Sequence, residues 1–265
     1  MAQAYGSRQM INDKLRAVLS NVQRHLPGGS ILSKLVSSYR LRNGVGVGGR
    51  KHPKDIFTYI YEQNRWGRRE SASGPGSTLQ HTENIRREIP NLIRQFNVLR
   101  LLDAPCGDYN WFRLVPRVNN FAYIGGDIVS AIVRNNQEAF GNATTEFIEL
   151  DIITEAIPEV DMWLCRDALF HFSDEQVFRT LANFLRSDIR YFLTTSYVES
   201  TRNTDIPTGY FRPINLELPP FSLGTPITRI DDWTEGQPVR KLCLWERSIL
   251  ADRLHVNDEF LKAKN

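Results

Sequence analysis

Four aspartates each end a short apolar run, and their carboxylates are suited to hold the polar edges of a ligand. These residues are Asp103, Asp127, Asp151 and Asp167. Asp127 lies 24 residues after Asp103, the separation at which the second acid of a nucleotide-binding fold accepts hydrogen bonds from both hydroxyls of a ribose. Asp151 is suited to accept from an adenine amino group, with Ile152 packing on the ring. The pattern therefore indicates a nucleoside-type ligand.

Helical stretches separate the apolar runs, and this alternation predicts a parallel sheet with helices on both faces. In an open parallel sheet, ligands bind outside the carboxyl ends of the strands at a switch point, so the aspartates are expected to meet there. Gly107 follows the first strand and allows the backbone to pass close to a ligand. A capping box over 173–176 marks the start of the last helix. The expected strands cover 98–102, 121–124, 146–150 and 160–164, and the expected helices about 82–96, 128–139 and 174–186.

Composition excludes several classes of protein. The chain has 265 residues, of which 41% are hydrophobic and 24% charged, and this is typical of a globular protein rather than of a disordered, collagenous or coiled-coil chain. Three cysteines without paired short spacing predict neither a disulfide framework nor a zinc or iron–sulfur site, and no clustered His and carboxylate set indicates a metal. The apolar runs are too short to span a bilayer. A soluble, cytoplasmic protein is therefore expected.

The charge is distributed unevenly along the chain. Residues 1–54 carry ten Lys or Arg and one acid, so this segment has a charge of +9, whereas the whole chain has +3 and residues 55–265 therefore −6. We interpret 1–54 as a basic helical extension and hinge, followed by the main domain at 55–265. Such an arm is suited to anionic lipid or nucleic acid; the alternative is a solvated arm without a specific partner.

The motifs, taken together, resemble those of class I S-adenosylmethionine (SAM)-dependent methyltransferases. The likeness covers about 95–197 and depends on four motifs in order: L-L-D-A-P-C-G at 101–107, Y-I-G-G-D-I at 123–128, F-I-E-L-D-I at 147–152 and D-M-W-L-C-R-D-A-L-F-H at 161–171. The resemblance implies a Rossmann-like α/β sandwich: a mostly parallel seven-stranded sheet with an antiparallel last strand, here near 239–245. It also implies SAM as the cofactor. The cofactor-binding residues it implies are Asp103, Ala104, Pro105, Cys106, Gly107, Asp127, Ile128, Asp151, Ile152, Cys165 and Arg166.

The first motif departs from the glycine-rich pattern that family members commonly show. Pro105 and Tyr109 replace two of its glycines, and Gly107 remains. Proline fixes φ and removes an N–H donor, so the loop is expected to be stiffer. The loss also disfavours a pyrophosphate ligand, which needs several free amides, and thus disfavours a nicotinamide-dependent oxidoreductase.

Two flanking segments resemble a bacterial-type subgroup of methyltransferases that has a D-A-P-C-G-D first motif and is often associated with glycan or secondary-metabolite genes. The segments are W-G-R-R-E-S-A-S-G-P-G-S at 66–77 and G-Y-F-R-P-I-N-L-E-L-P-P-F at 209–221. We interpret the first as a loop that orders over a ligand, and the second, within an insertion at about 198–235, as one wall of a substrate pocket; simple structural packing is the alternative. Trp66, Arg69 and Arg212 are the candidate substrate-binding residues, and the arginines favour an anionic or phosphorylated acceptor.

His171 and Asp167 are the candidate catalytic residues. Methyl transfer to a hydroxyl needs positioning and a base, and His171 follows the fourth strand, near the expected methyl group. Asp167 is interpreted as orienting it or binding the substrate. The alternative is that His171 caps or packs against the following helix.

The predicted activity is methyl transfer from SAM to a hydroxyl of a small molecule, sugar or glycan. Two alternatives stay open: a SAM-binding scaffold without catalysis, which the altered glycine loop favours, and a nucleic-acid methyltransferase, which the basic arm favours. Against the latter, residues 167–170 do not match the Asn/Asp-Pro-Pro-aromatic motif of enzymes that methylate exocyclic amino groups.

Overall fold

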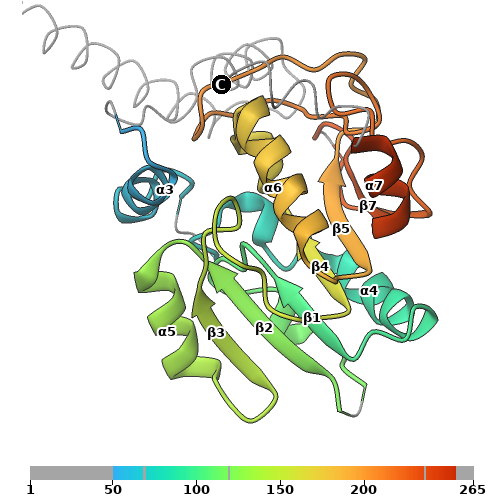
Figure 1. Ribbon diagram of the computed structural model, residues 1–265. Coiled ribbons are helices and arrows are strands. Elements are labelled where there is room, and N and C mark those ends of the chain that lie inside the picture. The colour runs from blue at the N-terminus through green and yellow to red at the C-terminus, as the bar shows by residue number, and fades with distance from the viewer. Residues whose placement is uncertain (1–49, 68–69, 119, 236, 255–265) are drawn as a thin grey trace, which may run out of the picture. The chain divides into compact units, whose positions relative to one another are not determined.

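A seven-stranded mixed sheet forms the centre of the structure (Figure 1). The computed structural model describes residues 50–67, 70–118, 120–235 and 237–254. The strand order is β3-β2-β1-β4-β5-β7-β6. The first five strands in this order, β3-β2-β1-β4-β5, run parallel to one another, and β7 is antiparallel to both β5 and β6. The bounds are β1 Arg100–Asp103, β2 Ala122–Asp127, β3 Thr145–Glu149, β4 Met162–Cys165, β5 Tyr191–Ser196, β6 Thr228–Asp231 and β7 Lys241–Glu246. The predicted fold class, with its antiparallel last strand, is confirmed.

Five α-helices of the described ranges surround this sheet. Their bounds are α3 Pro53–Glu62, α4 Glu83–Gln95, α5 Ser130–Phe140, α6 Asp174–Arg186 and α7 Arg247–Leu254, with short 3-10 turns η1 Pro75–Ser77, η2 Phe112–Leu114 and η3 Leu169–His171. The three helices expected from the sequence correspond to α4, α5 and α6.

The capping box predicted for α6 forms only in part. The Ser173 hydroxyl accepts from the amide of Gln176, as expected. The second hydrogen bond of a capping box, from the Ser173 amide to the Gln176 side chain, is absent. The Gln176 side chain instead accepts from the Thr208 hydroxyl, and the Ser173 amide donates to the same Thr208 oxygen. Thr208 therefore takes the place of one half of the box and attaches the segment after β5 to the start of α6.

Apolar side chains cover both faces of the sheet. Along β4, Trp163 and Cys165 face one side and Met162 and Leu164 the other, and all four are fully buried. Helices α6 and α7 pack on the first side and α4 on the second. Burial on both faces accounts for the continuous apolar runs of the central strands, and it leaves the strand ends as the place for polar chemistry.

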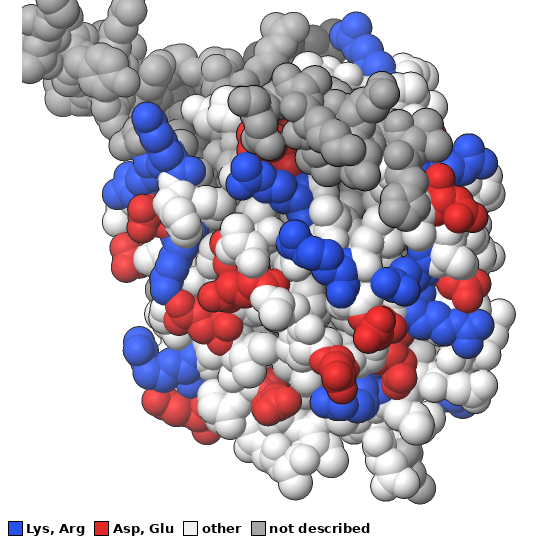
Figure 2. Space-filling view, in the orientation of Figure 1, with Lys and Arg blue, Asp and Glu red and all other residues white. Residues whose placement is uncertain are grey.

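The predicted basic extension lies mostly outside the described residues, and with it the expected contacts to anionic lipid or nucleic acid. On the face shown in Figure 2, basic and acidic side chains are interspersed. Among the residues placed by the structure, no helix is long and apolar enough to cross a membrane.

Candidate functional site

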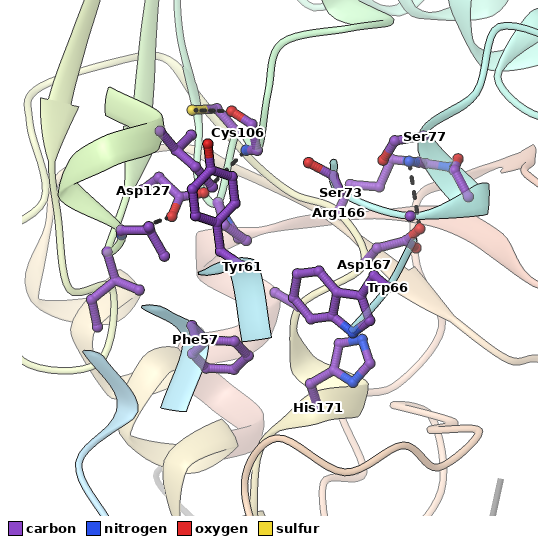
Figure 3. Close-up of a pocket in the computed structure, with 18 of the residues that line it drawn as sticks. Phe57, Tyr61, Trp66, Ser73, Ser77, Cys106, Asp127, Arg166, Asp167 and His171 are labelled. Atoms are coloured by element: carbon purple, nitrogen blue, oxygen red, sulfur yellow. Dashed lines mark hydrogen bonds and ion pairs between the residues drawn. The ribbon is translucent and has the colours of Figure 1, made fainter. Parts of the chain in front are cut away.

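A cavity of about 280 Å³ lies at the carboxyl ends of the central strands. The chain leaves β1 toward β2 and leaves β4 toward β5, so the sheet has its switch point between β1 and β4, where open α/β sheets bind ligands. In Figure 3, Asp127 and Cys106 lie at one end of the site, and Trp66 and His171 at the other. We call these the Asp127 end and the His171 end.

Asp127 ends β2 and lines the cavity with a buried carboxylate. One oxygen accepts from the amide of Gly107 at 3.1 Å and the other from the amide of Val129 at 2.9 Å. Burial raises the pKa of Asp127 to about 6, although these amide donors favour the charged form. Each carboxylate oxygen accepts more than one hydrogen bond, so the group remains able to receive a ligand's hydroxyls.

Asp103, at the end of β1, is a second buried carboxyl on the same cavity. The Tyr123 hydroxyl donates to it at 2.8 Å. Burial raises the pKa of Asp103 to about 7, and the neighbouring charge of Asp127 acts in the same direction. Burial also raises the pKa of Cys106 well above its usual range, so this cavity-lining side chain is a neutral thiol.

The loop after β1 uses its own amides internally. The Ala104 amide donates to the Leu164 carbonyl, and the Cys106 amide donates to the Gly126 carbonyl. The Gly107 amide donates to the Asp127 carboxylate, and the Asp108 amide donates to the Ser73 hydroxyl. Pro105 has no N–H group. No amide from 104 to 108 is therefore free to bind a phosphate.

Most of the predicted cofactor-binding residues meet at this cavity. Those that line it are Asp103, Pro105, Cys106, Gly107, Asp127, Ile128, Asp151, Ile152 and Arg166. The carboxylate of Asp151 also stabilises its own turn, since it accepts from the amide of Ile153 and the hydroxyl of Thr154.

Ala104 and Cys165 do not line the cavity, so the structure does not support their assignment. Both side chains are fully buried in the core on the α6 side of the sheet. The Ala104 carbonyl accepts from the Trp163 indole and the Cys165 carbonyl from the Thr194 hydroxyl. Side chains alternate between the faces of a strand, which explains why residues inside a motif can point away from its ligand.

The segment 70–77 crosses the loop after β1, and we call it the strap. The Asp108 carboxylate accepts from the Ser71 hydroxyl at 2.9 Å and from the Ala72 amide at 2.7 Å. A Cβ at Gly107, whose φ is +57°, would lie 2.1 Å from the Ser73 hydroxyl oxygen. The strap therefore occupies the space beside the Gly107 backbone, where a ligand was expected to come close. Residues 72–77, part of the loop that we interpret as ordering over a ligand, line the cavity.

A buried network of ions joins the strap to the ends of β4 and β7. Asp232 receives two hydrogen bonds from Arg166, both at 2.9 Å, and its carboxylate lies 3.5 Å from Arg240. Arg240 lies 3.1 Å from Asp167, and Arg166 also donates to the Gly76 carbonyl at 2.7 Å. Burial alone would raise the pKa of Asp167, but the two guanidinium groups outweigh it and hold that pKa below its usual value.

His171 lies at the end of η3 and lines the cavity. Its Nδ1 lies 2.8 Å from the Tyr210 carbonyl oxygen, which only accepts, so Nδ1 carries the proton and Nε2 has the free electron pair. The ring stacks on Trp66 with centroids 5.5 Å apart. Burial lowers the pKa of His171, so the ring is neutral at pH 7. No hydrogen bond joins it to Asp167 in the part of the chain that the structure describes; the Tyr210 carbonyl orients it instead.

The predicted substrate residues divide into three cases. Trp66 lines the cavity, whereas Arg69 is outside the described residues. Arg212 does not line the cavity. It is buried beside α6, where it contacts Asp174 at 2.9 Å and the Thr204 carbonyl at 2.9 Å, so its charge is used to attach the segment after β5.

Several residues of the site escaped prediction. Arg240, Tyr197 and Asp108 belong to different strands and loops, and no local spacing connects them with the strap. An arginine at the start of an expected last strand was the only signal for Arg240. Its partner Asp232 lies in a segment that was interpreted as an insertion.

No protein-family model matches the sequence, and no curated protein matches it either. Solved structures do resemble the fold. Magnesium protoporphyrin IX methyltransferase (ChlM) from Synechocystis PCC 6803 with bound SAM is 17% identical, covering 76% of this chain and 99% of that chain, with a TM-score of 0.50. The same enzyme with bound S-adenosylhomocysteine (SAH) is 13% identical, with 81% and 99% covered and a TM-score of 0.51. PigF with SAH is 14% identical, with 81% and 68% covered and a TM-score of 0.50. The chain thus has the Rossmann-like fold of class I SAM-dependent methyltransferases.

Proposed function

We propose that this protein transfers a methyl group from SAM to a hydroxyl of a small molecule. One observation carries the proposal: the Asp127 carboxylate at the end of β2 and the neutral ring of His171 line the same cavity at the switch point of the sheet. The Asp127 carboxylate is suited to bind ribose hydroxyls, and the His171 ring is suited to accept the proton that the acceptor hydroxyl must lose.

The residues of the Asp127 end fit SAM better than a dinucleotide. Asp127 would hold the ribose hydroxyls, Ile128 and Ile152 would pack on the adenine, and Asp151 would receive its amino group. All amides from 104 to 108 are used within the protein, which disfavours the pyrophosphate of a nicotinamide cofactor. SAM has no phosphate and does not need these donors.

His171 supplies the base. SAM, when bound, supplies a methyl group on a positively charged sulfur. The Tyr210 carbonyl holds the tautomer that leaves Nε2 unprotonated, and Nε2 accepts the hydroxyl proton as the acceptor oxygen becomes a nucleophile. Asp167 is held by Arg240 and by the Thr195 hydroxyl, so its role is to shape the His171 end rather than to carry a proton.

Calorimetric titration of the full chain with SAM, SAH and NAD tests this assignment. We expect micromolar binding of SAM and SAH and none of NAD. Binding of NAD alone would refute the methyltransferase assignment. Binding of SAM without any conversion to SAH across a panel of hydroxyl acceptors would favour a scaffold role.

A further inference from the structure

Aromatic rings surround the His171 end of the cavity. They come from α3, from the segment before the strap, from η3, from the end of β5 and from the segment after β5, and they include Phe57, Trp66, Phe170, Tyr197 and Phe211. Phe57, Trp66 and Phe211 are only half-buried, so part of each ring surface is not covered by the protein. Exposed apolar surface that is gathered in one concavity is typical of a ligand site.

The rings contact one another and the candidate base. Trp66 stacks on His171, and Phe57 lies between Trp66 and Phe172, with centroid distances of 6.3 and 5.8 Å. Phe211 meets Phe170 edge to face at 5.2 Å. Such a wall presents both ring faces and ring edges, which are the surfaces that a flat aromatic molecule contacts.

The charges at this end are already compensated. Arg166 and Arg240 are paired with Asp167 and Asp232, so two cations face two anions within the protein. Tyr197 and Arg240 both line this end of the cavity. An anionic acceptor would find no uncompensated cation in this network, and the several hydroxyls of a sugar would meet a cavity surface that is mostly apolar.

We propose that the acceptor is a flat, uncharged aromatic compound with a ring hydroxyl; this inference rests on the proposed function. The acceptor oxygen forms a bond to the methyl carbon and loses its proton to Nε2 of His171. The electron pair of the broken carbon–sulfur bond stays on sulfur, which leaves as a neutral thioether. A neutral imidazole is a weak base, and a phenolic hydroxyl, with a pKa of about 10, is acidic enough for it.

Four probe molecules test the proposal by calorimetry, each titrated with and without saturating SAH. They are 2-naphthol, its saturated analogue decahydro-2-naphthol, the charged 6-hydroxy-2-naphthoate and the sugar methyl α-glucoside. We expect 2-naphthol to bind at least tenfold tighter than each of the other three. Equal or tighter binding of the saturated, charged or sugar probe would overturn the proposal.

Two cavity variants and one control test whether 2-naphthol binds at the His171 end of the cavity. Trp66→Leu and Phe211→Leu should each weaken 2-naphthol binding at least fivefold, and the second variant tests the proposal if the first fails to fold. Trp233→Leu is the matched control, because Trp233 is 39% exposed and lies outside the cavity; its affinity for 2-naphthol should be unchanged. Unchanged affinity in both cavity variants would contradict the aromatic site.

The titrations separate this proposal from the proposed function. If SAH binds and 2-naphthol is not preferred, the acceptor class is wrong and the cofactor assignment stands. If 2-naphthol binds through Trp66 but SAM and SAH do not bind, the aromatic site is real and methyl transfer is wrong.

Discussion

Ser73 and Asp108 exchange hydrogen bonds across 35 residues of sequence. The Asp108 amide donates to the Ser73 hydroxyl oxygen at 3.0 Å, and this hydroxyl lies 3.3 Å from an oxygen of the Asp108 carboxylate. The pair attaches the strap to the loop after β1 directly beside Gly107. The cavity is therefore built from two segments that are far apart in the chain.

Gly107→Ala should displace the strap. The new Cβ would lie 2.1 Å from the Ser73 hydroxyl oxygen and 3.0 Å from its Cβ, and the positive φ adds backbone strain of about 1–2 kcal/mol. We expect at least tenfold weaker SAM binding in calorimetry and faster hydrogen exchange at the Ala72 amide. Gly224→Ala is the control, because Gly224 has φ +74° but its nearest contact is 3.3 Å, to a flexible arginine. Equal losses of affinity in the two variants would show that backbone strain alone is responsible.

Asp127→Asn should weaken SAM binding by roughly 10- to 100-fold, because hydrogen bonds to a charged group contribute about 1.5–3 kcal/mol. The measurement is calorimetric titration with SAM. Asp161→Asn is a matched control: its carboxylate accepts from the amides of Leu99 and Arg100 at 2.8 and 2.7 Å, but it precedes β4, at the opposite end of the sheet. Unchanged affinity in Asp127→Asn would place the ribose elsewhere.

His171→Gln should lower turnover at least 100-fold and change SAM affinity less than twofold, since general bases contribute about 10²- to 10⁴-fold. The neutral ring is the active form of the base, and burial lowers the pKa of His171 below the ordinary histidine pKa of about 6.5. The ring therefore stays neutral as the pH falls to about 6.5. Turnover at saturating SAM should therefore stay level down to about pH 6.5 and decline only below it. Equal activity of the variant would reject the base.

Asp103 should make the free protein less stable as the pH rises. Its folded pKa of about 7 exceeds the ordinary 3.8, so the folded state binds the extra proton, and its stabilising effect is complete below about pH 4 and lost as the pH rises through about 7. Each pKa unit corresponds to about 1.4 kcal/mol, so the effect is on the order of a few kcal/mol.

Urea unfolding of the wild type and Asp103→Asn at about pH 5 and pH 8 measures this effect. The wild type should lose stability relative to the variant between the two values. An identical change of the unfolding free energy in both proteins would contradict the raised pKa.

The order along the chain of strands β1 to β4 and helices α4, α5 and α6 follows from the sequence alone. Continuous apolar runs predict strands buried on both faces, and the helices between them require parallel neighbours. Once the sheet is parallel, residues that end its strands must lie at one edge. The sequence therefore predicts that Asp103, Asp127, Asp151 and Asp167 lie together, and all four line the cavity.

Tertiary structure decided what those strand ends meet. Ala104 and Cys165 belong to the matched motifs but point into the core, whereas Arg240 reaches Asp167 across 73 residues because β7 inserts between β5 and β6. Arg212 was predicted for the substrate and is paired beside α6 instead. Local spacing reports periodicity and burial, but the partner of a buried charge is set by which distant segment packs against it, and only the folded chain contains that information.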